Sequence, residues 1–308
     1  MKRGMILAAL LAVGGLSLGV SAFQQAGDGQ PQTITVDKVK DNLFVLRGGG
    51  GNTAVFVGTG GVVLVDAKNP SWGQPILDEV KKLTNKRITH LINTHSHYDH
   101  TGGNVELASD VEIVTHENTK TNIDRWALPT SIAKQPNSPF KANPGKGLPD
   151  LTFEDRLTIN EGSDQIDLFY FGRGHTNGDT WVLFPALRVV HSGDIFAGKN
   201  LPVLDAANGG SGVAMPDSLM KAATTLAEHN VETIVTGHSA TTMSMADLRE
   251  WADFNSDFLN TVRAGKQAGK SVDDIAAGYK VSAKFTGYGT PRPLRVKSNV
   301  QVIFDELR

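Results

Sequence analysis

The chain has 308 residues, with 30 Lys and Arg against 32 Asp and Glu, and a formal net charge of −2 at pH 7. This balance, without clusters of basic residues, argues against nucleic-acid binding, because phosphate neutralisation dominates the affinity of nucleic-acid-binding proteins. The chain has no Cys, which excludes disulfides and thiolate ligands, so any bound metal must be held by His and carboxylates.

Residues 1–22 are expected to be a secretory signal peptide. Lys2 and Arg3 give a basic start, residues 5–20 form an apolar run of 16 residues, and a Val-Ser-Ala motif at 20–22 is a small-residue cleavage site. The run is shorter than the ~20 residues of a membrane span, and no Cys follows it that could carry a lipid. We therefore expect a periplasmic or secreted protein, with a net charge of −4 after cleavage and no stable membrane association.

The mature chain is expected to begin with a flexible polar leader, residues 23–32, followed by one large domain over residues 33–308. Runs of β-branched and apolar residues between Gly-rich turns predict strands, and apolar residues at helical spacing predict helices. In the first half, the expected strands are 33–39, 43–47, 53–58, 62–66, 88–93 and 111–114, and the expected helices are 74–83 and 117–124.

Residues 125–150 contain five Pro and no sustained periodicity, so a long loop or lid is expected there. Further on, Ser244 and Asp247 resemble a capping box that opens a helix. Strands and helices mixed in this way predict a layered α/β domain with helices outside. The other elements expected after residue 150 are strands at 151–159, 166–171, 180–184, 189–191, 231–235 and 299–304, and helices at 216–229 and 271–277.

The hexapeptide His-Ser-His-Tyr-Asp-His at 95–100 follows an expected strand and contains four potential metal ligands, His95, His97, Asp99 and His100. A solvated polar loop is the alternative, but such a loop does not require three imidazoles and a carboxylate so close together. Imidazole and carboxylate ligands favour zinc, with iron or manganese as alternatives. The hexapeptide therefore predicts a metal site.

Three further potential ligands follow other expected strands. His175 lies in Gly-His-Thr, Asp194 in Ser-Gly-Asp and His238 in Thr-Gly-His. Gly beside each of them allows a sharp turn at a strand end, where catalytic groups are commonly displayed. Five His and two Asp exceed the needs of one tetrahedral zinc, so two metal ions are expected. The expected assignment is His95, His97 and His175 on one ion, Asp99, His100 and His238 on the other, and Asp194 and a hydroxide as the two bridges.

In this order, the motifs resemble those of the metallo-β-lactamase superfamily, over roughly residues 34–240. The resemblance implies a four-layer αββα sandwich with a dinuclear site at one edge, and it identifies Asp66 as a structural residue behind that site. The main zinc β-lactamases have Cys where this chain has Asp194, whereas a bridging Asp is usual in the glyoxalase II, lactonase and ribonuclease branches. The long helical C-terminal domain of glyoxalase II is absent, because mostly one helix and a tail are expected after Trp251. The chain thus resembles an exported hydrolase branch near the β-lactamases.

The resemblance and the ligand set imply an exported zinc hydrolase with two Zn²⁺ per chain and a small-molecule substrate. Two zinc ions lower the pKa of a bridging water from ~15.7 towards ~7, and the resulting hydroxide would attack the carbonyl of a β-lactam amide, lactone, ester or thioester. Asp99 would orient this nucleophile or relay its proton, which makes it the expected catalytic residue. β-Lactam hydrolysis, and antibiotic resistance with it, is expected as a main or a side activity.

Two other functional interpretations stay open. The same ligands in this superfamily can hold iron, as in persulfide dioxygenases or in oxygen reductases with a flavin domain, which this chain lacks. Alternatively, a non-catalytic periplasmic accessory protein could bind metal without turnover, although the complete ligand set argues against it.

Several residues outside the ligand set have both a functional and a structural interpretation. Lys199 lies five residues after Asp194, on the loop where relatives place a Lys that binds a substrate carboxylate. The alternative is an ordinary solvated Lys. His116, His191 and Asp179 are expected as hydrogen-bond partners of the ligands or as ordinary structural residues. The residues expected only in structural roles are His90 in the sheet, His229 at a helix end, and Tyr98 packed under the site.

Overall fold

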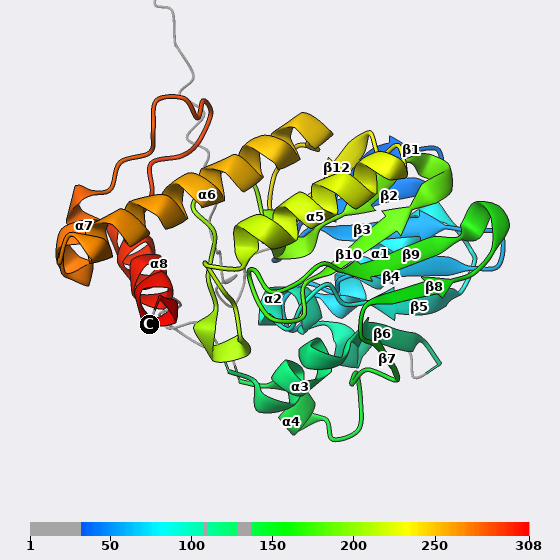
Figure 1. Ribbon diagram of the computed structural model, residues 1–308. Coiled ribbons are helices and arrows are strands. Elements are labelled where there is room, and N and C mark those ends of the chain that lie inside the picture. Colours follow the sequence, from blue (N-terminus) through cyan, green and yellow to red (C-terminus); the bar gives the residue numbers. More distant parts are fainter. Residues whose placement is uncertain (1–31, 108–109, 128–136, 308) are drawn as a thin grey trace, which may run out of the picture.

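The computed structural model describes residues 32–107, 110–127 and 137–307 (Figure 1). The expected signal peptide and nearly all of the polar leader lie outside the described residues. Among the residues described, no helix has both the length and the apolar character needed to cross a membrane. With two exceptions, the expected strands and helices are present, and their ends differ by about two residues or fewer.

The first sheet has seven strands in sequence order, β1-β2-β3-β4-β5-β6-β7. Strands β1 to β4 pair antiparallel, and strands β4 to β7 pair parallel. Strand β4 is a continuous buried run of Val-Val-Leu-Val, as expected for a strand covered on both faces. The strands are β1 (Thr35–Lys40), β2 (Leu43–Arg47), β3 (Thr53–Val57), β4 (Val62–Val65), β5 (Ile88–Ile92), β6 (Glu112–His116) and β7 (Leu151–Phe153).

The second sheet has five strands in the order β12-β11-β10-β9-β8, antiparallel except for the pair β11 and β12. In β10, Trp181 and Leu183 pack in one apolar cluster while Val182 and Phe184 pack in another, because successive side chains of a strand point to opposite faces. The strands are β8 (Arg156–Ile159), β9 (Ile166–Tyr170), β10 (Thr180–Phe184), β11 (Val189–His191) and β12 (Thr233–Val235).

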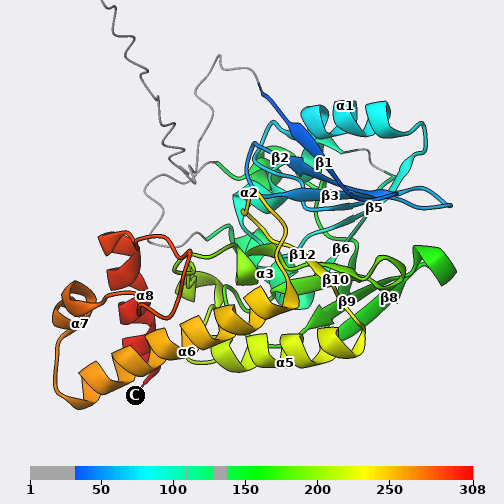
Figure 2. The same ribbon diagram turned by 90° about the horizontal axis from the view of Figure 1, so that it is seen from above.

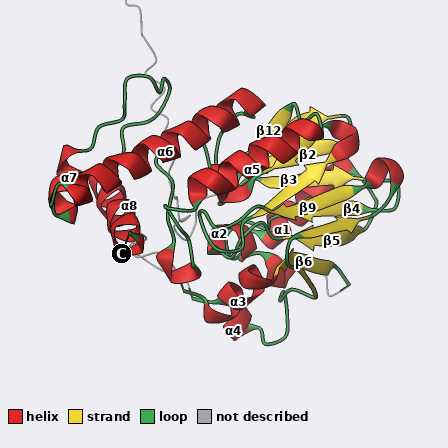
Figure 3. Cartoon of the chain, viewed as in Figure 1, coloured by secondary structure: helices red, strands yellow, loops and turns green. Residues whose placement is uncertain are grey.

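The helices lie outside the two sheets and at the end of the chain (Figure 3). The expected capping box of the longest helix is present, because Ser244 and Asp247 exchange side-chain to backbone hydrogen bonds. The α-helices are α1 (Gly73–Leu83), α2 (Tyr98–Thr101), α3 (Glu117–Arg125), α4 (Pro139–Ala142), α5 (Met215–Glu228), α6 (Met245–Gln267), α7 (Val272–Gly278) and α8 (Pro293–Glu306). Short 3₁₀ helices are η1 (Asn104–Glu106), η2 (Gly162–Asp164), η3 (Pro185–Leu187), η4 (Gly193–Phe196) and η5 (Ala206–Asn208).

The two sheets pack face to face, with α1 on one outer side and α5 and α6 on the other (Figure 2). Apolar side chains of both sheets form the central core, in which the rings of Phe56 and Phe184 lie 5.3 Å apart. A second cluster joins α1 to the first sheet, and a third joins α5, α6 and α8 to the second sheet. The architecture is therefore the expected four-layer αββα sandwich.

The strand expected at 151–159 is two strands that belong to different sheets. Strand β7 ends at Phe153 in the first sheet, and β8 begins at Arg156 in the second. Glu154 and Asp155 between them are exposed, as expected for charged residues, which are rarely buried unpaired. Apolar residues on both sides of this crossing made the segment resemble one strand.

The strand expected at 299–304 is wrong, because these residues belong to α8. Every second residue from 300 to 304 is apolar, which resembles a strand. The buried residues, however, include Val296, Val300 and Ile303 at helical spacing, and they pack in the third cluster. The end of the chain therefore consists of α6, α7 and α8 rather than one helix and a tail.

The segment expected to be a loop or lid, residues 125–150, is described only in part, because 128–136 lie outside the described residues. The remainder contains α4, which Ser138 caps. The ring of Trp126 packs edge-on against Phe140, with centroids 5.4 Å apart. A lid function of this segment stays a prediction.

Candidate metal centre

The four segments that carry the predicted ligands meet where strands of both sheets end. The hexapeptide follows β5 of the first sheet, and its Asp99 and His100 lie in the single helical turn α2. The other three follow strands of the second sheet: His175 follows β9, Asp194 follows β11 and His238 follows β12. His238 is 27% exposed and the other six predicted ligands are buried, so solvent reaches the site on the His238 side.

The seven side chains form two groups, and within each group the potential ligand atoms lie within 4.8 Å of one another. His97 Nδ1 lies 3.0 Å from His175 Nε2 in one group. In the other, His100 Nε2 lies 3.3 Å from His238 Nε2. The groups are His95, His97, His175 and Asp194, and Asp99, His100 and His238.

The Asp194 carboxylate lies between the two groups. Its Oδ2 is 3.8 Å from His175 Nε2 and 3.2 Å from His238 Nε2. Its Oδ1 is 3.4 Å from His100 Nε2. One carboxylate therefore faces both groups, which is the position that a bridge between two metal ions requires.

Hydrogen bonds on the opposite ring nitrogens fix how these imidazoles are turned. His97 Nε2 donates to Asp205 Oδ2 (2.7 Å), and His100 Nδ1 donates to Asp66 Oδ2 (2.6 Å). Each bond leaves the other nitrogen of the ring, facing the site, as an acceptor or ligand. The same arrangement holds for two further pairs, His175 Nδ1 with the Val203 carbonyl (2.7 Å) and His95 Nδ1 with Thr94 Oγ1 (3.0 Å).

Two glycines allow the backbone to approach the ligands closely. A Cβ at Gly51 would overlap the His100 ring, and a Cβ at Gly237 would overlap Asp194 Oδ1. Only glycine fits at these two positions while the ligands keep their places.

The buried polar atoms of the site fit a bound cation. Among the described residues, His95 Nε2 and Asp194 Oδ1 are buried without a hydrogen-bond partner. Buried polar atoms in proteins are almost always paired, because an unpaired one loses its hydration without compensation. Converging imidazole nitrogens and carboxylate oxygens are typical ligands of zinc and similar divalent metals. The donor set therefore fits metal binding.

Protonation favours the same interpretation in the first group. Burial and the neighbouring imidazoles hold the pKa of His95 well below its usual value, and burial lowers the pKa of His175 to about 4. Both rings are therefore neutral at pH 7, as metal ligands must be.

In the second group, burial alone would lower the pKa of His238, but Asp194 and Asp99 raise it to about 9. A bound metal would therefore have to displace a proton there. Burial alone would raise the pKa of Asp99, but His100 and His238 keep it down at about 2, so this carboxylate is ionised.

Behind the site, Asp66 has the structural position that the resemblance implied. It is fully buried with φ of 65°, and it accepts hydrogen bonds from Thr94 N (2.8 Å), Thr94 Oγ1 (2.8 Å) and His100 Nδ1 (2.6 Å). Nearby, the fully buried Lys68 donates to the carbonyls of Leu46 (2.8 Å) and Gly51 (2.9 Å). Lys68 thus fixes the glycine-rich turn at Gly51 against the site.

Several residues with two interpretations prove to be structural. Asp179 accepts from Thr176 N (2.9 Å) and Thr176 Oγ1 (2.6 Å), which holds the turn after His175. His191 contacts the backbone of Asn52 (3.0 Å) rather than a ligand side chain. His116 caps α3. The three residues expected only in structural roles make structural contacts: Tyr98 packs beside Ile123, Trp126 and Phe140, His90 pairs with Glu112, and the ring of His229 contacts Phe169.

Lys199 is partly exposed, and its ammonium group is paired with acidic side chains of the chain itself. Its Nζ lies 2.7 Å from Asp247 Oδ1 and 3.3 Å from Glu250 Oε1, both on α6. Two carboxylates therefore neutralise its charge. The acidic residues responsible lie about 50 positions further along the chain, so the local sequence could not reveal them.

Comparison with known proteins shows the family. A family model described as the metallo-beta-lactamase superfamily matches residues 46–238, and the chain therefore belongs to this superfamily. The match includes all seven predicted ligands. It begins within β2 and ends at His238, before α6 and the helices that follow it.

Curated relatives are similar over parts of the chain. The metallo-beta-lactamase type 2 of Elizabethkingia meningoseptica is 28% identical over 192 residues, which cover 58% of this chain and 69% of that protein. The protein of the same name from Bacillus sp. (strain 170) is 28% identical over 173 residues, 52% of this chain and 60% of that protein. A hydroxyacylglutathione hydrolase of Rhodospirillum rubrum is 45% identical over 58 residues, 18% of this chain and 21% of that protein.

Solved structures confirm the fold. A metallo-beta-lactamase from Pontibacter korlensis superimposes with a TM-score of 0.58 at 18% identity, covering 73% of this chain and 99% of that chain. A stereoselective inverting sec-alkylsulfatase from Pseudomonas sp. superimposes with a TM-score of 0.64 at 14% identity, covering 89% of this chain and 50% of that chain. At such low identity the likeness concerns the fold, and neither activity carries over to this chain.

Proposed function

We propose that the protein is a two-metal hydrolase that uses two zinc ions per chain to cleave a carbonyl compound. The observation that carries this proposal is the Asp194 carboxylate, which faces both groups of ligands at 3.2–3.8 Å. The predicted ligands His95, His97 and His175 would hold one ion. The others, Asp99, His100 and His238, would hold the second.

When bound at such a site, two divalent metals polarise a carbonyl and activate water for attack near neutral pH. The chain's own residues position the reactants around them. Asp99 Oδ2 lies 3.3 Å from His238 Nε2 at the more exposed group, where it would accept a hydrogen bond from the attacking water and orient it. Asp205 and Asp66 would keep His97 and His100 in place during turnover.

The names of the relatives support a proposed substrate class. Two of them are named metallo-beta-lactamases and one is named a hydroxyacylglutathione hydrolase. Both names describe hydrolases, which supports hydrolysis over the iron-dependent oxidation and the non-catalytic role considered above. The proposed substrates are small molecules with an amide, lactone, ester or thioester bond, and β-lactams are among them.

The test is hydrolysis by protein loaded with zinc or with iron. A chromogenic cephalosporin, a lactone, an aryl ester and a thioester would be followed spectroscopically at pH 7. We expect turnover of at least one of them by the zinc form, abolished by a chelator and restored by added zinc. No turnover of the whole panel, or activity with the iron form alone, would contradict the proposal.

We also propose that the protein is exported to the periplasm or beyond. The motivation is the basic start, the apolar run and the Val-Ser-Ala motif within residues 1–22. Protein purified from an expressing bacterium should begin at Phe23 when its N-terminus is sequenced. An intact Met1 in a membrane fraction would contradict export with cleavage.

A further inference from the structure

Helix α8 holds a segment of the chain that orients two of the predicted ligands. This support segment, residues 202–205, lies between η4 and η5. Its Val203 carbonyl accepts a hydrogen bond from His175 Nδ1 (2.7 Å). Its Asp205 carboxylate accepts one from His97 Nε2 (2.7 Å). Both imidazoles belong to the first ligand group, so one short segment turns two of the three rings of that group.

Asn299 of α8 contacts both peptide groups that flank Val203. Its Nδ2 donates to the Pro202 carbonyl (2.8 Å), and its Oδ1 accepts from Leu204 N (3.4 Å). Asn299 is fully buried, although Asn is mostly an exposed residue in proteins. Buried amide groups are stable when both of their ends are hydrogen-bonded, and here the support segment supplies both partners.

The Leu204 N–H and the Val203 carbonyl belong to one peptide group, which is planar and trans. The N–H and the carbonyl therefore point in opposite directions, and a residue that holds the N–H also fixes the direction of the carbonyl. Hydrogen bonds connected in this way polarise one another, so Asn299 also makes the carbonyl a stronger acceptor. The connection runs from Asn299 Oδ1 through the peptide group to His175 Nδ1, which leaves His175 Nε2 turned towards the site.

Further contacts attach the second half of α8 to the chain that follows the support segment. Glu306 Oε2 accepts from Val213 N (3.2 Å), and Glu306 Oε1 lies 3.5 Å from the Arg173 guanidinium. A Cβ at Gly212 would overlap the side chain of Ile303. Helix α8 therefore packs directly onto the backbone between η5 and α5, which limits how far the support segment can shift.

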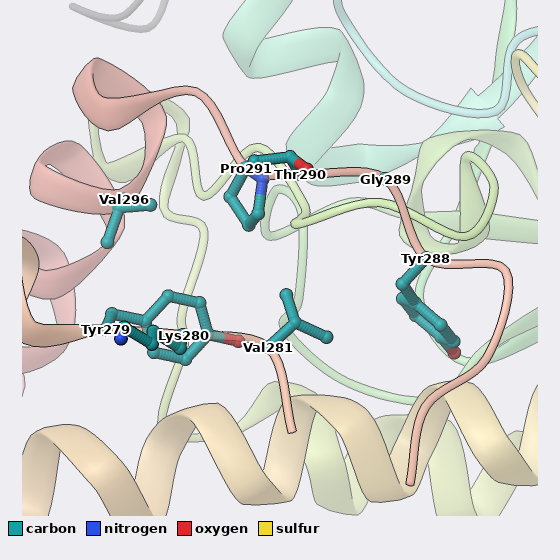
Figure 4. Close-up of a pocket in the computed structure, with 8 residues that line it drawn as sticks. All are labelled: Tyr279, Lys280, Val281, Tyr288, Gly289, Thr290, Pro291 and Val296. Atoms are coloured by element: carbon teal, nitrogen blue, oxygen red, sulfur yellow. The ribbon is translucent and has the colours of Figure 1, made fainter. Parts of the chain in front are cut away.

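The first half of α8 borders a cavity of about 300 Å³ (Figure 4). Val296 of α8 lines this cavity together with Tyr288 and Pro291 of the segment before the helix. Among the described residues, none that lines the cavity is a predicted metal ligand or belongs to the support segment. The polar attachment of α8 to the support segment is therefore made by Asn299, three residues after Val296.

We propose that Asn299 is a positioning residue of the metal centre, which fixes the Val203 carbonyl so that the His175 ring presents Nε2 to a metal in the first group. The inference rests on the proposed function, because it assumes that a metal binds at this group. Asn299 acts through a peptide group and not on a reacting atom. It also lies beyond residues 46–238, the part of the chain that matches the superfamily.

The second ligand group is oriented from another part of the chain. His100 Nδ1 donates to Asp66 Oδ2 (2.6 Å), and Asp66 Oδ1 accepts from Thr94 N (2.8 Å). Asp66 and Thr94 follow β4 and β5 of the first sheet, whereas the support segment follows β11 of the second. A substitution of Asn299 should therefore weaken the metal in the first group and leave the metal in the second group unchanged.

Zinc binding by full-length variants, measured in competition with a chromophoric chelator, tests this proposal without turnover. Asn299→Leu, which removes both hydrogen bonds, is combined with His238→Ala to disable the second group, or with His95→Ala to disable the first. With His238→Ala, Asn299→Leu should weaken zinc binding about tenfold, the lower end of the usual effect of groups that orient a metal ligand, because Asn299 acts through a peptide group. With His95→Ala, it should leave zinc binding unchanged.

A spectroscopic measurement and a control separate positioning from a general loss of stability. The visible absorption of bound Co²⁺ reports ligand geometry, and Asn299→Leu should change it in the His238→Ala protein. Asn255→Leu is the matched control, because Asn255 is also buried and donates from Nδ2 to a carbonyl, that of Trp251 (2.8 Å), within α6. Asn255→Leu should make the metal-free protein easier to unfold in urea but should change neither zinc affinity nor the Co²⁺ spectrum.

The possible results have distinct consequences. Asn299→Ala leaves space instead of an apolar side chain and should weaken zinc binding in the same way, so the expected result does not depend on how Leu fits. Unchanged zinc affinity and an unchanged Co²⁺ spectrum in the His238→Ala protein would overturn the role of Asn299 and leave the proposed hydrolysis untouched. Equal weakening with His238→Ala and with His95→Ala would also overturn it, because a general loosening would then be the cause. Failure of the wild type to bind zinc would overturn the metal centre, and this inference with it.

Discussion

Asp194→Ala is expected to lose hydrolysis by orders of magnitude and to bind closer to one zinc than two, with the fold intact. The carboxylate faces His100, His175 and His238 at 3.2–3.8 Å, so it is placed to touch both metals at once. It also offsets part of the charge that two divalent cations bring into one cavity. Without it, repulsion between the metals rises, and the group with fewer imidazoles should empty first.

Zinc content by mass spectrometry and steady-state kinetics check this expectation. Asp194→Asn is the matched variant, because it keeps the shape of the side chain and one oxygen but removes the charge. It should retain more zinc than Asp194→Ala and still hydrolyse far more slowly than the wild type. Two tightly held zinc ions and wild-type turnover in Asp194→Ala would show that the bridge lies elsewhere.

Asp66→Ala is expected to destabilise the metal-free protein by about 3–5 kcal/mol, the usual cost of removing one partner from a buried charged pair. Asp66 is fully buried and accepts three hydrogen bonds, two from Thr94 and one from His100. The Ala variant leaves these donors unpaired. It also places a side chain without local hydrogen bonding at φ of 65°. In addition, loss of the bond to His100 should weaken zinc binding by about tenfold to a hundredfold.

Urea unfolding of the metal-free protein measures the first effect, and competition with a chromophoric chelator measures the second. Asp164→Ala is the matched control. Its carboxylate also accepts several hydrogen bonds, from Thr59 and Gly60, but Asp164 is only partly buried, whereas Asp66 is fully buried. It should lose clearly less stability and no zinc affinity. Equal losses of stability and of zinc affinity in Asp66→Ala and Asp164→Ala would contradict the expectation that the burial of Asp66 beside His100 causes these effects.

The ligands could be predicted from sequence because they are local to strand ends. Each of the four segments combines a short apolar run with Gly, His or Asp directly after it. Parallel strands of one sheet end at the same edge, so side chains that directly follow such strands are expected to lie close together there. Which group each side chain joins depends on contacts across both sheets, yet the structure brings the seven together in the two expected groups, with Asp194 facing both.

The residues that orient the ligands could not be predicted in the same way. Asp205 lies 108 residues from His97, and no pattern around Asp205 distinguishes it from other acidic residues. Val203 acts through its backbone carbonyl, which carries no sequence signal. Lys199 is a single basic residue in sequence, and only the packing of α6 shows that it is paired.

The errors in secondary structure have a common physical origin. In α8 and at the crossing between β7 and β8, apolar residues alternate or continue in a way that fits a strand locally. Packing decides otherwise, because Val296, Val300 and Ile303 bury one helical face against the outer cluster. A short apolar run does not distinguish a strand from one side of a helix.

Titration of metal-free protein with zinc, while hydrolysis of the best substrate of the panel is followed, tests the two-metal centre most directly. The seven buried or partly buried ligands in two groups predict that activity rises until two equivalents of zinc are bound per chain and then stays constant. Activity that is complete at one equivalent, or protein that binds no more than one zinc, would contradict a centre built from both groups.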